Sequence, residues 1–434
     1  MAWDFSTEPE FQEKLEWIRA FVRDEAEPLE LAFGGEGLMY DKKHPVHDEV
    51  VRPLQQQVKA QGLWACHLGS DLGGKGYGQV KLALMAEILG RCAWAPSLFG
   101  CQAPDSGNAE ILAHYGSDEQ KERYLEPLLE QRIVSCYSMT EPHAGSDPRL
   151  FNCRAERDGD DWVINGEKFF SSNLRYADFA IVMAITNPDV PVYQGASMLL
   201  VPTDTPGLQI LRHTGVGTEP EGTGNHPHVR YENVRVPGEA LLGGEGQAFA
   251  IAQTRLGGGR LHHAMRTVGA VQKCFDMMRE RAVSRRTTDG LLADKQMVRE
   301  AIADSWVQIL QFRLQVLHAA WTCDRVGGSA ARAEIAGVKV ATAKVYHDVV
   351  IRALHLHGAL GVSNEMPFTS HLLAALSLGI ADGPTEVHKL TIAKAALKGV
   401  EPAEGLWPTG HLPARRAEAR RRFAHLLEHE VGNQ

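Results

Sequence analysis

The sequence lacks the short signatures of several large enzyme classes. Its 434 residues contain no G-x-G-x-x-G, no G-x-S-x-G and no H-E-x-x-H, the patterns of a dinucleotide-binding turn, a serine-hydrolase nucleophile and a zinc protease. The seven cysteines are scattered, odd in number and without a Cys-x-x-Cys pair. This spacing argues against a disulfide framework or a zinc site, and it indicates reduced thiols in a cytoplasmic protein.

The 19 histidines do not supply a metal site either. His262 and His263 are adjacent, and neighbouring residues of a helix point in different directions. His355 and His357 have no carboxylate or thiol at ligand spacing. We therefore expect no metal.

Long apolar runs and an excess of positive charge are also absent. No window approaches 18 uninterrupted apolar residues, so we expect no transmembrane helix and no membrane partner. The opening stretch, MAWDFSTEPEFQEKLEW, has no basic segment followed by an apolar run, so we expect no signal peptide. A net charge of −9 argues against nucleic-acid binding over the whole surface.

The remaining composition, 44% hydrophobic and 23% charged, is typical of a globular enzyme. Residues 1–135 read as helical, because FQEKLEWIRAFVRDEAEPL places Phe11, Leu15, Ile18 and Val22 on one face. Residues 246–434 also have the helical period. EAIADSWVQILQFRLQVLHAAWTCDRV and ARAEIAGVKVATAKVYHDVVIRALHLHG are long and amphipathic, which indicates a helical bundle, and RRAEARRRFAHLLEHE predicts a tail helix.

Residues 136–245 predict a β domain. ADFAIVMAIT and GASMLLVPTD are apolar runs typical of strands, and HPHVRYENVRVP alternates. An Asp158-Gly159 turn comes first, and Asn165-Gly166 then gives the strongest short-range hairpin signal. Because the strands are clustered rather than alternating with helices, the predicted class is α+β and not a doubly wound sheet.

The stretch GIADGPTEVHKL (379–390) places one acid, Asp382, before a glycine and a proline. Pro384 suits the first turn of a helix, and an Asp just before that helix can accept its backbone N–H groups. Taken alone, the stretch favours a capping role for Asp382 over a catalytic one.

Two loop-like stretches carry a resemblance to a known family. YSMTEPHAGSDP (137–148) is rich in small and hydroxyl residues, which leaves backbone N–H groups free to bind a polar ring edge or a phosphate. Together with INGEKFFSSN (164–173), it resembles the flavin-binding core of the acyl-CoA dehydrogenase family, TEPxxGSD followed by NGxKxxxxN. Further ordered matches are GQAFAIAQTRLGGGRLHHAMRTVGA (246–270), SRRTTDGLLADKQ (284–296), HLHGALGVSNEMP (355–367) and ADGPTEVH (381–388).

The last blocks are closest to a subgroup that includes the dehydrogenase part of mammalian multidomain proteins with a kinase-like domain. The resemblance implies an N-terminal helical domain (1–135), a central β-barrel or sandwich (136–245), and a C-terminal four-helix bundle with a tail helix (246–434). It also implies FAD and an acyl-CoA substrate, which the family oxidises to the trans-2-enoyl-CoA.

The resemblance changes the expected role of Asp382. The family abstracts an α proton with a carboxylate, usually a Glu, and Asp382 takes its place. Arg260 matches an arginine near that carboxylate, where a cation holds it ionised. Ser146, Arg260 and Ala381 match positions that touch the acyl-CoA.

The resemblance also assigns a set of FAD contacts. Arg285 and Gln296 match residues that reach across a subunit interface to a neighbour's FAD, which implies a homodimer or homotetramer. His355 replaces a family Gln, and Pro384 replaces a Thr that often bonds FAD. The full set is Tyr137, Met139, Thr140, Gly145, Ser146, Phe170, Ser171, Ser172, Arg285, Gln296, His355, Gly358 and Glu386.

Three functions remain open. The first is an acyl-CoA dehydrogenase of fatty-acid β-oxidation that passes electrons to electron-transfer flavoprotein. The second is a flavin oxidase of the same fold, similar to nitroalkane oxidase, which also uses an Asp base. The third is a DNA-associated flavoprotein, but Glu418 and the net charge of −9 favour a solvated helix. The tail-helix residues that could form a basic face for DNA are Arg415, Arg416, Arg420, Arg421 and Arg422.

Overall fold

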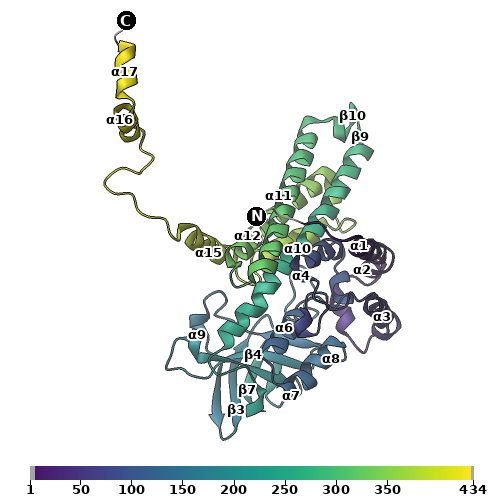
Figure 1. The fold of residues 1–434 in the computed structure, drawn as a ribbon. Helices are drawn as coiled ribbons and strands as arrows, with labels where there is room; N and C mark the ends of the chain where they lie inside the picture. The colour runs from purple at the N-terminus through teal and green to yellow at the C-terminus, as the bar shows by residue number, and fades with distance from the viewer. Residues whose placement is uncertain (1–4, 432–434) are drawn as a thin grey trace. The chain divides into compact units, whose positions relative to one another are not determined.

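The described chain up to Leu129 consists of helices joined by loops (Figure 1). The computed structural model describes residues 5–431, which form one compact unit up to Thr391 and a second from Ile392 onward. The N-terminal helices are α1 (Pro9–Phe21), α2 (Glu27–Phe33), α3 (Arg52–Ala60), α4 (Gly78–Leu89), α5 (Ala95–Leu98), α6 (Asp105–Tyr115), α7 (Asp118–Gln120) and α8 (Glu126–Leu129). Phe11, Leu15, Ile18 and Val22 are all buried, as their helical spacing predicts.

A mixed sheet follows. Its strands are β1 (Ser135–Ser138), β2 (Arg154–Asp158), β3 (Asp161–Lys168), β4 (Phe179–Ile185), β5 (Ala196–Pro202), β6 (Leu208–Arg212), β7 (His228–Pro237) and β8 (Leu241–Leu242). They run in the order β6-β7-β3-β2-β4-β5-β8, and β1 pairs with β4 in parallel.

The central strands β4 and β5 of this sheet are buried on both faces. Along β4, Phe179 and Ile181 join a core with residues of α6 and α10, whereas Ala180 and Val182 join a core with residues of β3 and β7. Alternate residues of a strand point to opposite faces, which explains this division. The sheet therefore presents one face to the helices that carry the candidate site.

The hairpin predicted at Asn165-Gly166 is wrong. β3 runs through both residues, and the turn lies earlier, where Asp158 pairs with Asp161. The β3–β7 register shifts between Ile164 and Gly166, which marks a bulge. Gly166 has φ +144°, and a Cβ there would lie 2.6 Å from the Cys153 Cα, so the glycine allows close strand approach rather than a turn.

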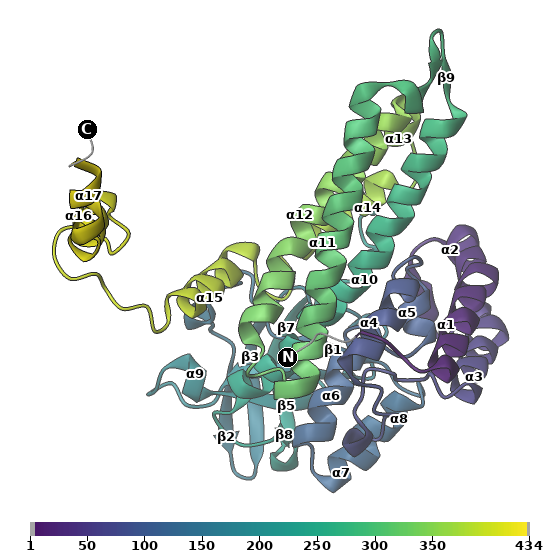
Figure 2. The same ribbon diagram turned by 45° about the horizontal axis from the view of Figure 1, so that its top comes forward.

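Six helices of the described chain follow the sheet up to Leu397, and α10, α11, α12 and α14 share the core of a bundle (Figure 2). The six are α10 (Ala248–Ser284), α11 (Gln296–Val326), α12 (Arg332–His357), α13 (Ala359–Val362), α14 (Phe368–Leu378) and α15 (Thr385–Leu397). α10 has 37 residues, and a short hairpin, β9 (Arg286–Thr287) and β10 (Gly290–Leu291), joins it to α11. The predicted order of helical, β and helical parts is therefore confirmed. Of the helices between residues 5 and 431, none has the length and apolar character that a bilayer crossing needs.

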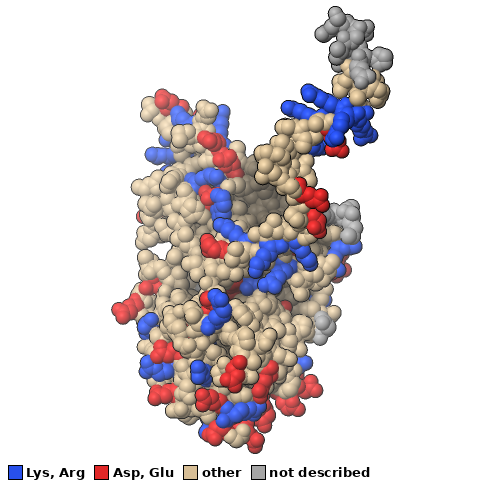
Figure 3. Space-filling model, turned by 90° about the vertical axis from the view of Figure 1, so that its left-hand side faces the viewer, with Lys and Arg blue, Asp and Glu red and all other residues tan. Residues whose placement is uncertain are grey.

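Beyond α15, the described residues of the second unit form two helices where one tail helix was expected. α16 (Leu412–Arg422) ends at Phe423, which has φ −107° and ψ +19°, and α17 (Ala424–Val431) follows. Its exposed arginines, Arg415, Arg416, Arg420, Arg421 and Arg422, gather in one blue patch in Figure 3.

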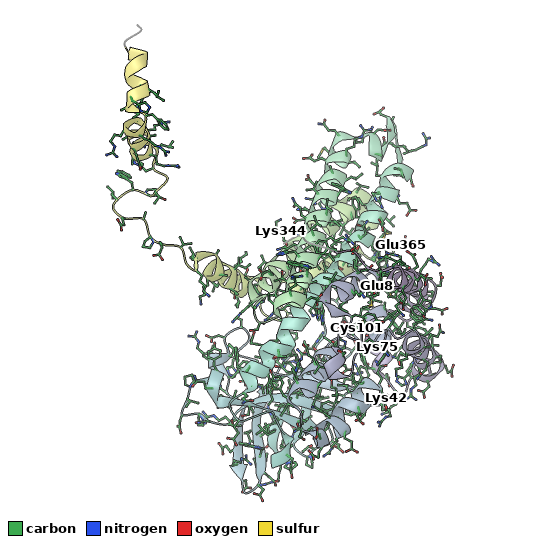
Figure 4. All side chains as sticks on the ribbon, in the orientation of Figure 1. Glu8, Lys42, Lys75, Cys101, Lys344 and Glu365 are labelled. Atoms are coloured by element: carbon green, nitrogen blue, oxygen red, sulfur yellow. The ribbon has the colours of Figure 1, made fainter. Side chains whose placement is uncertain are left out.

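The free cysteines are distributed over separate cores. Cys66, Cys92 and Cys101 (Figure 4) lie in the N-terminal helical core, Cys136 and Cys153 in the β core, and Cys274 in the bundle. All six are buried, and Cys323 is partly exposed.

Candidate active site

Asp382 lies in the loop between α14 and α15, in a left-handed backbone conformation with φ +56°. Asp and Asn adopt this conformation more readily than most residues. The Asp382 carbonyl oxygen accepts from Arg260 Nε at 2.8 Å and contacts His388 Nε2 at 3.3 Å. Two helices, α10 and α15, therefore hold the loop through its backbone, which leaves the side chain for another role.

The Asp382 carboxylate faces α10 rather than the start of α15. Its Oδ2 lies 3.4 Å from His263 Nε2, and a Cβ on Gly259 would lie 3.1 Å from the same oxygen. Within residues 5–431, the contact described for this carboxylate is with His263 of α10 and not with a backbone N–H of α15. The helix-capping role that the local sequence favours is therefore not seen.

The surroundings of Asp382 keep it ionised. Only 19% of its side chain is exposed, and burial by itself raises the pKa of a carboxyl. The close contact with His263 and the charges of Arg255 and Arg260 outweigh burial and lower the pKa of Asp382 below its usual range. An anion at this position can accept a proton at neutral pH.

Arg255 is a second cation at the site, which sequence reasoning missed. Its buried guanidinium lies 3.9 Å from the Tyr137 ring centroid, and Nε donates to Asn108 Oδ1 at 2.9 Å. The spacing of residues 255, 259 and 263 on α10 was a usable signal, because residues four apart share a helix face.

Two further ionisable groups lie beside this constellation. Lys339 of α12 is buried and donates to the Leu378 carbonyl oxygen; burial lowers its pKa to about 8. Glu110 of α6 lies against Gly258, where a Cβ would be 3.0 Å from its Oε2. Burial raises the pKa of Glu110 to about 7, although Arg255 opposes the shift.

The structure brings the two family-like loops together at the end of β1. The Phe169 N–H donates to the Thr140 carbonyl oxygen at 2.8 Å, and Ser138 Oγ lies 2.8 Å from Ser171 Oγ. Tyr137, at the end of the same strand, contacts Met139 Sδ at 3.6 Å. Tyr137, Met139, Thr140 and Ser171 are therefore neighbours.

A buried ion pair fixes this junction. Lys168 Nζ lies 2.9 Å from Glu141 Oε1 and donates to the Met139 carbonyl oxygen at 2.8 Å. The Glu141 carboxylate also accepts the backbone N–H groups of Asn152 and Cys153. Both ionic side chains are almost completely buried, at 0% and 1% exposure, so the pair connects the loop after β1 to β3 in a water-poor core.

The remaining members of this group line the surface beside it. Phe170 is 47% exposed and has φ +54°, an unusual backbone for an aromatic residue, and its ring packs on Phe169. Ser172 Oγ lies 2.7 Å from His226 Nδ1. Gly145 and Ser146 are exposed in the loop after β1, and Ala381 and Glu386 are exposed beside Asp382.

The other predicted contacts lie at the far end of the bundle. Arg285 follows α10 about 38 Å beyond Arg260, at about 1.5 Å per helical residue. Figure 1 shows the β9–β10 hairpin at the end of α10 opposite the sheet. Arg285, Gln296, His355 and Gly358 are all exposed, so one chain does not bring them to Asp382.

Metal ligation finds no support in residues 5–431, where no group of three His, Cys, Asp or Glu side chains is placed to hold an ion. His263 instead contacts Asp382. The sequence analysis considered His262 and His263 only as metal ligands and did not foresee this contact.

Comparison with known proteins identifies the family. The chain matches the models of the acyl-CoA dehydrogenase N-terminal domain at residues 8–132, the middle domain at 136–234 and the C-terminal domain at 246–397. It is 39% identical to rat "Acyl-CoA dehydrogenase family member 11" over 397 residues, covering 89% of this chain and 50% of the relative. The chain thus spans about half the length of the curated mammalian relatives it matches, in agreement with the predicted subgroup.

A bacterial relative and a solved structure match over nearly their whole lengths. "Probable acyl-CoA dehydrogenase FadE2" of Mycobacterium tuberculosis is 41% identical over 355 residues, which cover 80% of this chain and 86% of the relative. A solved "putative acyl-CoA dehydrogenase" of Mycobacterium abscessus is 37% identical, with a TM-score of 0.82, 90% of this chain covered and 99% of that chain. The chain therefore belongs to the acyl-CoA dehydrogenase family of flavin-dependent oxidoreductases.

Proposed function

We propose that this protein catalyses the FAD-dependent α,β-dehydrogenation of an acyl-CoA to the trans-2-enoyl-CoA and passes the electrons to electron-transfer flavoprotein. The observation that carries the proposal is the ionised Asp382 carboxylate, held beside Tyr137 and Arg255 where the two family-like loops meet. Family membership supports the reaction class.

In this proposal Asp382 is the base that accepts the α proton of the thioester. The two hydrogen bonds to its backbone carbonyl fix the loop, and the contact with His263 orients the carboxylate. Arg255 and Arg260 favour the anion before the proton arrives. Asp is one methylene shorter than the usual Glu, and the left-handed backbone at residue 382 suits the shorter side chain.

The residues beside Asp382 fit a flavin. The exposed Phe170 ring offers a flat apolar wall, and the Ser172 hydroxyl and the loop backbone around Gly145 offer polar partners for a ring edge. Tyr137, Met139, Thr140, Ser146 and Ser171 would complete the cradle. When bound, FAD supplies the acceptor for the β hydride.

The remote residues fit a shared site between subunits. Arg285, Gln296, His355 and Gly358 lie too far from Asp382 to serve the same chain, so we propose a homodimer or homotetramer in which they hold a neighbour's FAD. α11 also presents a row of exposed apolar side chains at helical spacing, which a second copy would cover. They are Trp306, Val307, Leu310 and Leu314.

Arg285→Ala is expected to weaken FAD binding about 10- to 100-fold, because it removes a charged partner of the pyrophosphate. The melting temperature should fall with it, since a ligand that binds only the folded state stabilises that state. Arg286→Ala, at the next exposed residue of β9, is the matched control and should change neither quantity. Flavin content and thermal unfolding are the measurements, and a fully loaded monomer would contradict the shared site.

The reaction is tested by mixing the FAD-loaded protein with a series of acyl-CoA esters without oxygen. We expect a good ester to bleach the flavin absorbance and to appear as the 2-enoyl-CoA by mass spectrometry. The Asp base is equally compatible with a flavin oxidase. Fast reoxidation by O₂, or bleaching by nitroalkanes and not by acyl-CoA, would favour the oxidase, whereas reoxidation by electron-transfer flavoprotein supports the dehydrogenase.

A further inference from the structure

His263 is connected on both sides of its imidazole ring. Its Nε2 faces Asp382 Oδ2 at 3.4 Å, and its Nδ1 lies 3.1 Å from an amino group of Arg266. The three residues come from α10 and the loop before α15. The ring therefore stands between a permanent cation and the candidate base.

Arg266 determines where the His263 proton lies. A guanidinium donates hydrogen bonds and accepts none, so the Nδ1 atom facing it must be the acceptor. In a neutral imidazole the proton is then on Nε2, the nitrogen nearest to Asp382. Burial lowers the pKa of His263, although the contact with Asp382 opposes the shift, so the ring is neutral at pH 7.

Arg266 is itself held from the N-terminal helical part. Its second amino group donates to the Cys101 carbonyl oxygen at 3.3 Å. The order of contacts is thus Cys101, Arg266, His263 and Asp382, running from a buried loop to the carboxylate. Each connection uses a different polar atom, so the ring cannot turn over without losing one of them.

We propose that His263 is a positioning residue: Arg266 fixes its Nε2–H tautomer, and this N–H orients the Asp382 carboxylate for proton abstraction. The proposal rests on the proposed function, because it assumes that Asp382 is the base. His388 and Arg260 hold the backbone of residue 382, whereas His263 contacts the carboxylate itself at Oδ2.

Several other titratable groups surround Asp382 and His263, and the substitutions of His263 described below leave all of them in place. Those that face Asp382 are Arg255 and Arg260 of α10, Lys339 of α12, His388 of α15 and Tyr137 of β1. Those that face His263 are His262 and Arg266 of α10 and Lys339 of α12.

Two conservative variants of His263 test whether the ring positions the Asp382 carboxylate or only packs against it. His263→Gln places an amide nitrogen near the position of Nε2, whereas His263→Asn places it near Nδ1. Stopped-flow flavin reduction by one good acyl-CoA, followed as a function of pH, is the readout. We expect Gln to stay within about fivefold of the native rate and Asn to lose about 10- to 100-fold at the plateau.

The pH dependence adds a signature that loss of packing would not give. His263 lowers the pKa of Asp382, so its loss raises that pKa, and the acid limb of the rate should move to higher pH in His263→Asn. A more basic carboxylate alone would speed proton transfer. A lower plateau rate of flavin reduction, together with an acid limb at higher pH, therefore identifies a loss of carboxylate orientation. A higher plateau rate would overturn the proposal.

The tautomer can be read without turnover. Histidine ring ¹⁵N NMR of the FAD-loaded protein, with His263 assigned by the Gln variant, should show a neutral Nε2–H ring that changes in Arg266→Met. A native Nδ1–H ring, or a native rate and acid limb in His263→Asn, would overturn this inference alone. Normal flavin reduction in Asp382→Asn would instead overturn the base assignment and this inference with it.

Discussion

Asp382→Asn is expected to slow flavin reduction by a good acyl-CoA by about 10²- to 10⁴-fold. Asn keeps the shape of the side chain and tolerates the left-handed backbone, but it cannot accept the proton. FAD content and melting temperature should therefore stay close to native. Anaerobic stopped-flow absorbance measures the rate. Near-native reduction would remove Asp382 from catalysis and make Glu110, whose pKa burial raises to about 7, the next candidate.

Two controls address the position of the carboxylate without removing it. Asp382→Glu should retain part of the activity, because it restores the commoner base with an extra methylene, although Glu suits the positive φ less well.

Gly259→Ala places a methyl group 3.1 Å from Asp382 Oδ2, whereas Gly257→Ala meets no atom within 4 Å. We expect the first to slow reduction and the second to leave it unchanged. Equal effects of the two would show that carboxylate position is unimportant.

Lys168→Met is expected to lower the free energy of unfolding by about 3–5 kcal/mol, the cost of leaving a buried carboxylate without its partner. Lys168 also donates to the Met139 carbonyl oxygen, so the loop that carries the flavin candidates should loosen and FAD affinity should fall. Urea denaturation and flavin titration measure the two effects. A loss of stability with native FAD affinity would separate this ion pair from the site.

Lys344→Met is the matched control, because it removes the same charge from a surface pair. Lys344 (Figure 4) is 73% exposed and lies 2.6 Å from Asp348, and such pairs contribute at most about 1 kcal/mol. Adding Glu141→Gln to Lys168→Met should recover part of the lost stability, since the buried charge is then gone. Fully additive losses would contradict a coupled pair.

Features that depend on local sequence were predictable. Helical spacing predicted the buried face of α1 and the long helices of the bundle, because a period of 3.6 residues is visible in any short window. The two loop blocks predicted a shared flavin site, which stays a prediction, and the structure places the residues around Thr140 and Phe169 next to each other.

Features that depend on distant contacts were not predictable in the same way. Asn165-Gly166 has the composition of a turn, yet β7 pairs across it and Cys153 approaches its glycine, so tertiary contacts decide the conformation. Arg255 and His263 gain their roles only because a loop more than a hundred residues later lies on their face of α10. The spacing of that face was visible, but its partner was not.

Because the cysteines are buried in separate cores, each one can serve as a probe of local opening in its own part of the protein. A thiol reagent reacts with a buried cysteine only after the surrounding structure opens, so its rate reports how often that part exposes itself. Cys66, Cys92 and Cys101 report on the N-terminal helical core, Cys136 and Cys153 on the β core, and Cys274 on the bundle. The native chain can thus reveal, by mass spectrometry of pulse-alkylated peptides, the order in which its three regions come apart and which of them flavin keeps closed.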